Sequence, residues 1–200
     1  MCDQFDSPAR TWRPLSVADV RPLVLDGPAW LSGGVALDAW LGFQSRQHAD
    51  VDVSVLRGQW PDFASQLPLW LCLYAAEDGL LTPLNQASAG ESVNNIWCLD
   101  DRTGEWCLQV NLEGGDGEQW KYRRCHDVTA SWNQAVLTVD GLRIVAPEIQ
   151  LLWKSKAPTP KDVADRELVI PRLDSTAHQW LANAISIAHT LSPWNGRHSR

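Results

Sequence analysis

Helical spacing of apolar residues marks the first part of the chain. Over residues 16–25 apolar side chains recur every three or four positions, which predicts a short amphipathic helix. Residues 30–42 run from an apolar pair through Gly33 and Gly34 into a second apolar-rich segment. We interpret this stretch as a loop that opens a helix, which Gly42 ends.

Strict alternation follows over residues 50–56 and predicts a half-buried strand. Its two faces carry Val51, Val53 and Val55 on one side and Asp50, Asp52 and Ser54 on the other. The strand therefore has one apolar face and one acidic face.

Strand patterns dominate the middle of the chain. A helix is expected over 57–67, and the apolar run 69–76 suits a buried strand. A hairpin is expected over 136–145, with Asp140-Gly141 as its turn. Turn-rich segments separate three more expected strands, at 95–99, 106–113 and 119–124.

From Pro147 onward the pattern becomes helical. Strands followed by helices indicate an α+β fold, in which helices flank a mixed β-sheet and further helices follow at the C-terminal end. We expect residues 1–146 to form an α/β core and residues 147–200 to pack on it as a helical segment. The chain would then be one compact unit.

Composition and charge narrow the class of protein. The 200 residues are 44% hydrophobic and 20% charged, with no apolar run long enough for a membrane span. The first 14 residues do not have the pattern of a secretory signal, so we expect a cytoplasmic protein. A net charge of −7 without a basic block disfavours nucleic acid as a partner. The five cysteines form no CxxC pair, so we expect them to be reduced, without disulfides or zinc.

Asp50 and Asp52 are the leading candidates for chemistry. Two carboxylates on one strand face lie about 6–7 Å apart, which suits joint ligation of Mg²⁺. Taken alone, an Asp-x-Asp pattern is more often an exposed acidic strand face. Upstream, Gly33 and Gly34 can let the backbone of a helix start approach a phosphate.

Two more donors lie between the glycines and the acids. Arg46 and His48 can bind phosphate or substrate. The alternative is structural: Arg46 as a surface charge, and His48 as a loop residue that bonds its own backbone.

Taken in order, these residues form a spaced motif: Gly-Gly after an apolar pair, an Asp in the helix, Gly, Arg-x-His, then Asp-x-Asp. The matching positions are Gly33, Gly34, Asp38, Gly42, Arg46, His48, Asp50 and Asp52. This order resembles the signature of the aminoglycoside and lincosamide nucleotidyltransferase branch of the polymerase-beta-like superfamily. Residues 154–173, with Lys161-Asp162-x-x-Asp165, also resemble a Lys-rich stretch of related proteins.

The resemblance implies a nucleotidyltransferase-like mixed sheet and a nucleoside triphosphate substrate. It implies two Mg²⁺ ions held by Asp50 and Asp52, and in-line attack of an acceptor hydroxyl on the α-phosphate. The nucleotide-binding positions that it suggests are Ser32, Gly33, Gly34, Arg46, His48, Lys156 and Lys161.

A third carboxylate is where this sequence departs from the family. The polar face of strand 106–113 carries Cys107, Gln109, Asn111 and Glu113, so its middle lacks an acid. Glu113, at the strand end, is the candidate for the third catalytic carboxylate; the alternative is a surface acid beside a turn. If the required position is Gln109, the enzyme would be slow or inactive.

Several polar residues have structural explanations of equal weight. Thr159-Pro160-Lys161-Asp162 is a good helix start, which makes Asp162 and Asp165 structural candidates. Asp38 can orient the acceptor or bond the adjacent loop, and the loop is the better candidate. Lysines 154, 156 and 161 can contact a triphosphate or form a solvated face; Lys156 and Lys161 are the better candidates.

Three functions remain open from the sequence. The first is Mg²⁺-dependent transfer of a nucleoside monophosphate to a hydroxyl of a small-molecule acceptor. The second is nucleotide binding without turnover, motivated by the missing mid-strand acid. The third is a toxin-like modification of RNA or protein. The fold alone does not identify the acceptor.

Overall fold

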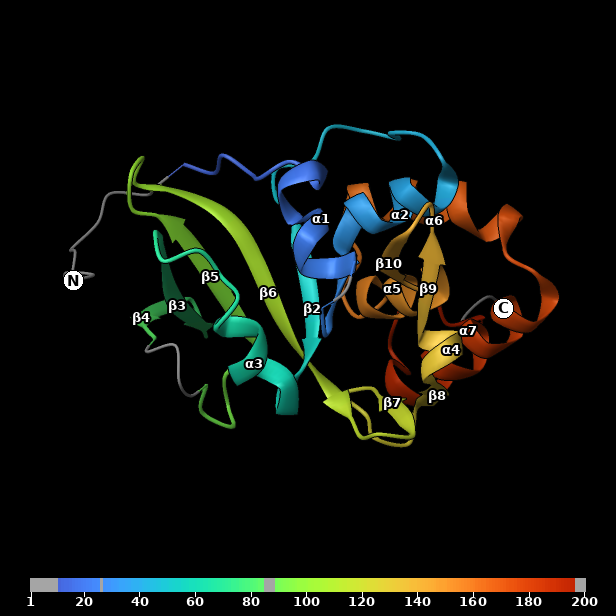
Figure 1. Ribbon diagram of the computed structural model, residues 1–200. Helices are drawn as coiled ribbons and strands as arrows, with labels where there is room; N and C mark the ends of the chain where they lie inside the picture. The colour runs from blue at the N-terminus through green and yellow to red at the C-terminus, as the bar shows by residue number, and fades with distance from the viewer. Residues whose placement is uncertain (1–10, 26, 85–88, 197–200) are drawn as a thin grey trace.

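A mixed β-sheet forms the centre of the molecule (Figure 1). The computed structural model describes residues 11–25, 27–84 and 89–196. Within this part of the chain the strands are ordered β4-β3-β5-β6-β2-β1-β10-β9, while β7 pairs with β6 and β8 pairs with β7. Their bounds are β1 (Ala29–Ser32), β2 (Asp52–Leu56), β3 (Leu71–Glu77), β4 (Leu80–Pro83), β5 (Asn95–Asp100), β6 (Glu105–Gly115), β7 (Gln119–Lys121), β8 (Thr129–Ser131), β9 (Val136–Val139) and β10 (Leu142–Val145).

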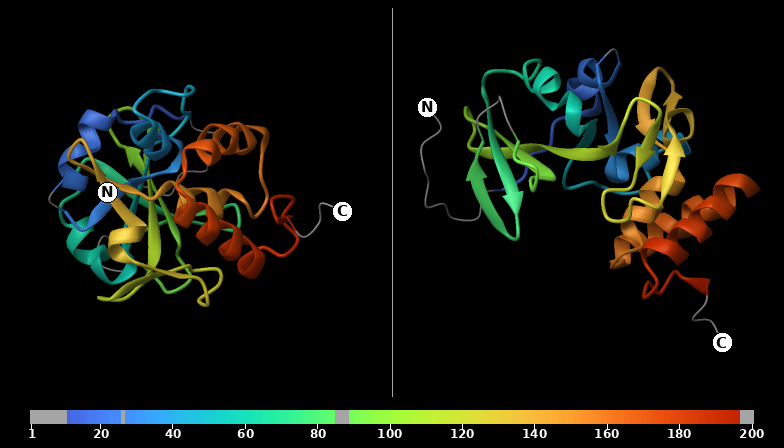
Figure 2. Two further views of the ribbon diagram at one scale, coloured as in Figure 1. Left: turned by 90° about the vertical axis from the view of Figure 1, so that its right-hand side faces the viewer. Right: turned by 90° about the horizontal axis from the view of Figure 1, so that it is seen from below.

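Helices flank the sheet, and the C-terminal ones gather at the end away from β3, β4 and β5 (Figures 1 and 2). There α5 packs against α2, α6 and α7. The helices are α1 (Val17–Leu25), α2 (Gly33–Leu41), the 3-10 turn η1 (Arg57–Gln59), α3 (Trp60–Ala64), α4 (Trp132–Ala135), α5 (Pro147–Lys154), α6 (Pro160–Val169), the 3-10 turn η2 (Ile170–Arg172) and α7 (Ser175–Ala188). The α+β class and the helix-flanked mixed sheet are therefore confirmed.

Parallel pairing of β2 with β6 builds the polar face at the centre of the sheet. Asp52 lies beside Gln109 and Ser54 beside Asn111 in the register, so these side chains emerge on the same side. On the opposite face Val53, Val55 and Val110 are fully buried. The alternation in the sequence thus correctly identifies which face of β2 is apolar.

Some predicted boundaries were wrong. The expected loop over residues 30–32 is strand β1, which the continuous burial of its four residues explains. Asp50 precedes β2, which begins at Asp52. The helix expected over 57–67 is the short η1 followed by α3, and β4 and β8 were not predicted.

Local turn and cap chemistry is as predicted. Asp140 and Gly141 both have positive φ, 48° and 74°, as a tight β9–β10 hairpin turn requires. At the start of α6, Thr159 and Asp162 form the expected capping box.

The cysteines differ from expectation at one position. Cys98, Cys107 and Cys125 are free, but Cys72 is disulfide-bonded, so the prediction that all cysteines are reduced was wrong. Within the described residues, the longest and most apolar helices still fall short of what crossing a bilayer requires.

Candidate functional site

A pocket of about 320 Å³ lies over the polar face of β2 and β6. Its size is at the lower end of the range for small-molecule sites. Its lining comes from the strand-rich part of the chain before residue 147 and from the helices after it. The lining residues are Gly33, Gly34, Arg46, Asp50, Asp52, Asn95, Gln109, Asn111, Glu113, Arg123, Arg124, Gln150, Trp153, Lys154, Lys161 and Asp162.

The glycine pair meets the acidic motif in this pocket. Gly33 has φ +73°, and a Cβ built on it would overlap the carboxylate of Asp52. A Cβ on Gly34 would overlap the guanidinium of Arg46 and lie 2.6 Å from His48 Nδ1. A side chain at either position would displace these neighbouring side chains, and at position 33 it would also be strained by the positive φ.

Asp38 of α2 holds that loop in place. Its carboxylate accepts hydrogen bonds from His48 Nε2 at 2.5 Å and from the hydroxyl and backbone N–H of Ser45 at 2.5 and 3.1 Å. Gly42, with φ 79°, ends α2 in the left-handed conformation and lets the chain turn. Asp38 thus bonds the adjacent loop, as expected.

Arg46 connects the same loop to the C-terminal helices. Its Nε and Nη2 donate to the two carboxylate oxygens of Asp165 at 3.0 and 3.2 Å. Lys154 in turn pairs with Asp162 at 2.6 Å and with Asp165 at 3.0 Å. Burial acts to raise the pKa of Asp165, but hydrogen bonds from Arg46 and Lys154 outweigh it and hold the pKa below its usual value.

Asp52 is the most perturbed acid in the pocket. Burial, followed by the charge of Asp50, raises its pKa to about 6, against the opposing effects of the Asn111 amide, Lys154 and Lys161. Asn111 Nδ2 donates to Asp52 Oδ1 at 3.3 Å. Within the described residues neither Asp50 nor Asp52 has a cationic side chain at ion-pair distance. Two neighbouring carboxylates that repel each other and lack a counterion fit a divalent cation with oxygen ligands.

The third carboxylate is not beside this pair. Glu113 lies beside Leu56 in the register, four residues beyond the partner of Asp52, or about 13 Å along the strand. In the described part of the chain no three His, Cys, Asp or Glu side chains are grouped to hold a metal ion. Gln109 and Asn111 take the positions nearest Asp52.

Glu113 instead lies buried at the other end of the pocket. It accepts a hydrogen bond from Trp120 Nε1 at 3.3 Å. Burial raises its pKa, against the attraction of Arg123, Arg124 and Arg57.

The remaining predicted residues are distributed unevenly. Lys161 lines the pocket, whereas the exposed Lys156 does not. Ser32 is fully buried, and its Oγ accepts a hydrogen bond from Ser54 Oγ at 3.0 Å. The backbone N–H of Gly33 donates to Gln150 Oε1 at 2.8 Å, so a phosphate would have to displace Gln150 to reach this N–H.

Sequence reasoning passed over several lining residues. The sequence pattern favours Lys156 over Lys154, and it does not identify Gln150, Asn95, Arg123 or Arg124. The Arg-Arg pair that ends the predicted strand 119–124 is a visible signal, but its place in this pocket depends on tertiary folding.

The overall fold of this chain is similar to that of solved structures. The solution structure of the antibiotic-resistance factor ANT(2'')-Ia aligns with a TM-score of 0.50 at 16% sequence identity, covering 80% of this chain and 82% of that chain. ANT(2")-Ia in complex with adenylyl-2"-tobramycin aligns at 0.48, with 16% identity over 80% of this chain and 87% of that one. Lincosamide antibiotic adenylyltransferase LnuA, lincomycin-bound, aligns at 0.47, with 16% identity over 71% and 85%.

The chain has the fold of the nucleotidyltransferases, as the spaced motif predicts. No family model and no curated protein matches its sequence.

Proposed function

We propose that this protein transfers a nucleoside monophosphate from a nucleoside triphosphate to a hydroxyl group of a small-molecule acceptor. The observation that carries the proposal is the convergence of Gly33, Gly34, Asp50 and Asp52 on one pocket. In that pocket the helix start at Gly33 lies against the carboxylate of Asp52.

Each part of the pocket has a role in this proposal. Asp50 and Asp52 would hold Mg²⁺, which neutralises charge on the triphosphate and the departing pyrophosphate. Gly33 and Gly34 leave the first turn of α2 without side chains, and a phosphate oxygen that displaces Gln150 would reach the N–H of Gly33 at the helix start. Lys154 and Lys161 place positive charge beside Asp52, where the phosphates would lie.

The reaction itself is a displacement at phosphorus. The acceptor oxygen forms a bond to the α-phosphorus while the bond from that phosphorus to the α,β-bridging oxygen breaks. Pyrophosphate leaves, and the hydroxyl proton passes to solvent water. The chain's contribution is to position the two reactants and to compensate charge.

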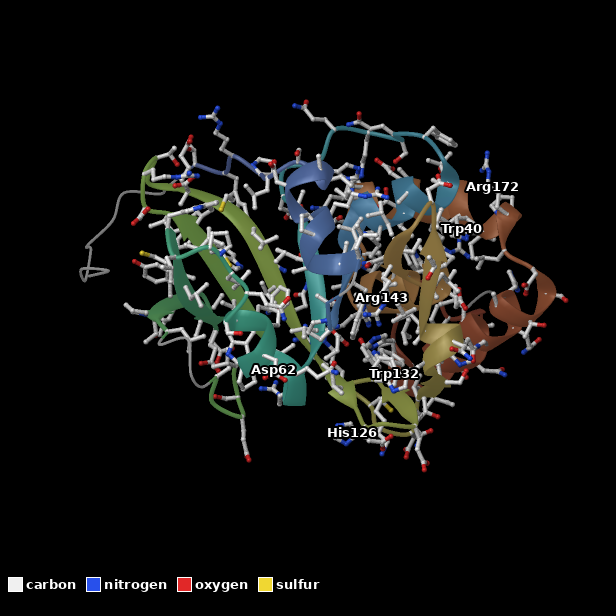
Figure 3. The ribbon with its side chains drawn as sticks, viewed as in Figure 1. Trp40, Asp62, His126, Trp132, Arg143 and Arg172 are labelled. Atoms are coloured by element: carbon white, nitrogen blue, oxygen red, sulfur yellow. The ribbon has the colours of Figure 1, made fainter. Side chains whose placement is uncertain are left out.

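A triphosphate labelled at the α-phosphate, Mg²⁺ and a panel of hydroxyl acceptors test the proposal. Wild-type protein should give a labelled product, and Asp52→Asn should lower the rate about a hundredfold or more. Asp62→Asn, an exposed acid on α3 that Figure 3 labels, is the matched control and should retain the rate. Equal rates for wild type and Asp52→Asn would refute the proposal.

Nucleotide binding without turnover is the second candidate. It is favoured by the amides of Gln109 and Asn111 beside Asp52, where an acid is expected for this family. Triphosphate that binds in an Asp52-dependent way, with no labelled product from any acceptor, would support this candidate over the first.

A further inference from the structure

We infer that Arg123 and Arg124 form a second anion-binding subsite, which receives a phosphate or carboxylate group carried by the acceptor. The inference rests on the proposed function, because it assigns a chemical class to the acceptor of that reaction. It concerns the end of the pocket that lies furthest along β6 from the Asp50–Asp52 pair.

The two arginines follow β7 and face the end of β6. Lys121 of β7 pairs with Gly114 in the register, and a Cβ on Gly114 would lie 3.9 Å from Arg123 Cα. The next turn, from Cys125 to Val128, carries His126, which Figure 3 labels at the foot of the molecule. Arg123 and Arg124 are thus neighbours of Glu113 rather than of Asp52.

Neither guanidinium is neutralised by an ion pair. Arg123 donates to the carbonyl oxygen of Asn94 at 3.2 Å and to Asn95 Oδ1 at 3.4 Å. Arg124 donates to the hydroxyl of Tyr122 at 2.9 Å. In the described ranges no carboxylate lies within 4.0 Å of either one. Because a guanidinium has five N–H donors, each arginine keeps donors for a ligand.

Positive charge exceeds negative charge at this end. Arg57 lies close enough to act on both Arg123 and Glu113, and it is anchored by the carbonyl oxygen of Gly90 and by Asn94 Oδ1. Arg57 and Arg123 are held by the same residue, Asn94, and Arg123, Arg124 and Glu113 line one pocket, so an anion that binds there relieves the repulsion between the arginines.

Two arginines side by side are suited to planar or tetrahedral oxyanions, which accept paired N–H donors. The triphosphate already has Lys154, Lys161 and the metal carboxylates at the other end of the pocket. The remaining reactant is the acceptor. A polycationic acceptor would be repelled here, so the charge of the pocket selects an anionic hydroxyl compound.

Inorganic phosphate tests the subsite without turnover. Titration calorimetry on the full chain should show that Arg124→Gln weakens phosphate binding about tenfold or more, since one charge-assisted contact is lost. Arg172→Gln, which lies outside this pocket, should leave this binding unchanged. Glu113→Gln should tighten it, because the competing carboxylate is removed. Arg124 is exposed, so its variant should fold. Equal phosphate affinity for wild type and Arg124→Gln would overturn the subsite.

Matched acceptors test the assignment to the acceptor. Phosphorylated and unphosphorylated forms of the same polyol are compared with the labelled triphosphate. Arg124→Gln should raise KM for the phosphorylated form and leave KM for the triphosphate unchanged. A raised KM for the triphosphate would overturn the assignment, because the arginines would then hold the nucleotide. If no acceptor is modified at all, the proposed function fails, and the phosphate titration alone decides the subsite.

Discussion

Arg46 and Asp165 form a two-point ion pair across 119 positions of the chain. Arg46 belongs to the loop that leads into β2, and Asp165 belongs to α6. The side chain of Asp165 is only 3% exposed, and it also forms an ion pair with Lys154. The loop that leads to Asp50 and Asp52 is therefore positioned by the C-terminal helices, so the pocket depends on residues far apart in the sequence.

Asp165→Asn is expected to destabilise the protein and to weaken triphosphate binding. Removing one partner of a largely buried pair leaves Arg46 without its counterion, at a cost of about 3 kcal/mol. Chemical denaturation measures the loss. Glu167→Gln, an exposed neighbour on the same helix, should remain within about 0.5 kcal/mol of wild type. Similar stabilities for the two variants would mean that the Arg46–Asp165 pair contributes little.

The glycine pair gives a second prediction. Gly34→Ala should push Arg46 and His48 away from the helix start, and Gly33→Ala adds strain at φ +73°. Both variants should weaken triphosphate binding about tenfold or more. Gly58→Ala is the control, because a Cβ there meets nothing within 4 Å. Isothermal titration with a non-hydrolysable triphosphate compares them, and unaltered affinity in Gly34→Ala would contradict the proposed phosphate approach.

The sequence was informative where the signal is local. The Gly-Gly pair, the helix after it and the alternation around Asp52 depend on short spacings, and all three lie close to their predicted positions. Side chains brought in by tertiary folding were less predictable. Lys154 and Lys156 lie two positions apart in the sequence. Lys154 is the last residue of α5 and pairs with Asp162 and Asp165, whereas Lys156 lies beyond the helix and is exposed.

Arg123 and Arg124 illustrate the same limit. Their relation to Glu113 depends on β7 folding back on the end of β6, and no periodic pattern encodes that pairing. Glu113 is the sequence candidate for the third catalytic carboxylate because it ends the predicted strand 106–113. The parallel register with β2 shows that it lies too far along to join Asp52.

Glu113 should make stability fall as pH rises. Burial raises its pKa above the unfolded value of 4.5, despite the attraction of Arg123, so the folded state holds the proton more tightly. This contribution is complete below pH 4.5 and is lost as pH rises through the folded pKa, at no more than about 1.4 kcal/mol per pH unit. Urea denaturation between mildly acidic and alkaline pH should show that Glu113→Gln loses this component. The exposed Glu118→Gln should keep it, and parallel profiles for wild type and Glu113→Gln would contradict the prediction.

Asn111→Asp should convert the site into a stronger cation site. The Asn111 amide lies 3.3 Å from Asp52 Oδ1, so the substitution places a third carboxylate next to the pair. Without divalent cations, repulsion among three acids should lower the melting temperature. With Mg²⁺ the melting temperature of Asn111→Asp should instead exceed that of the wild type, because three carboxylates hold the cation better than two. A tenfold gain in affinity corresponds to about 1.4 kcal/mol of added stabilisation at saturating Mg²⁺.

Melting curves with and without Mg²⁺ decide this case. Asn183→Asp adds the same charge on the exposed face of α7 and should show the Mg²⁺ response of wild type. If Asn111→Asp responds to Mg²⁺ no more than Asn183→Asp does, Asp50 and Asp52 do not hold the cation, because the added acid would otherwise strengthen their site. A larger response together with faster nucleotidyl transfer would show that the amide at position 111 limits the rate of the natural protein.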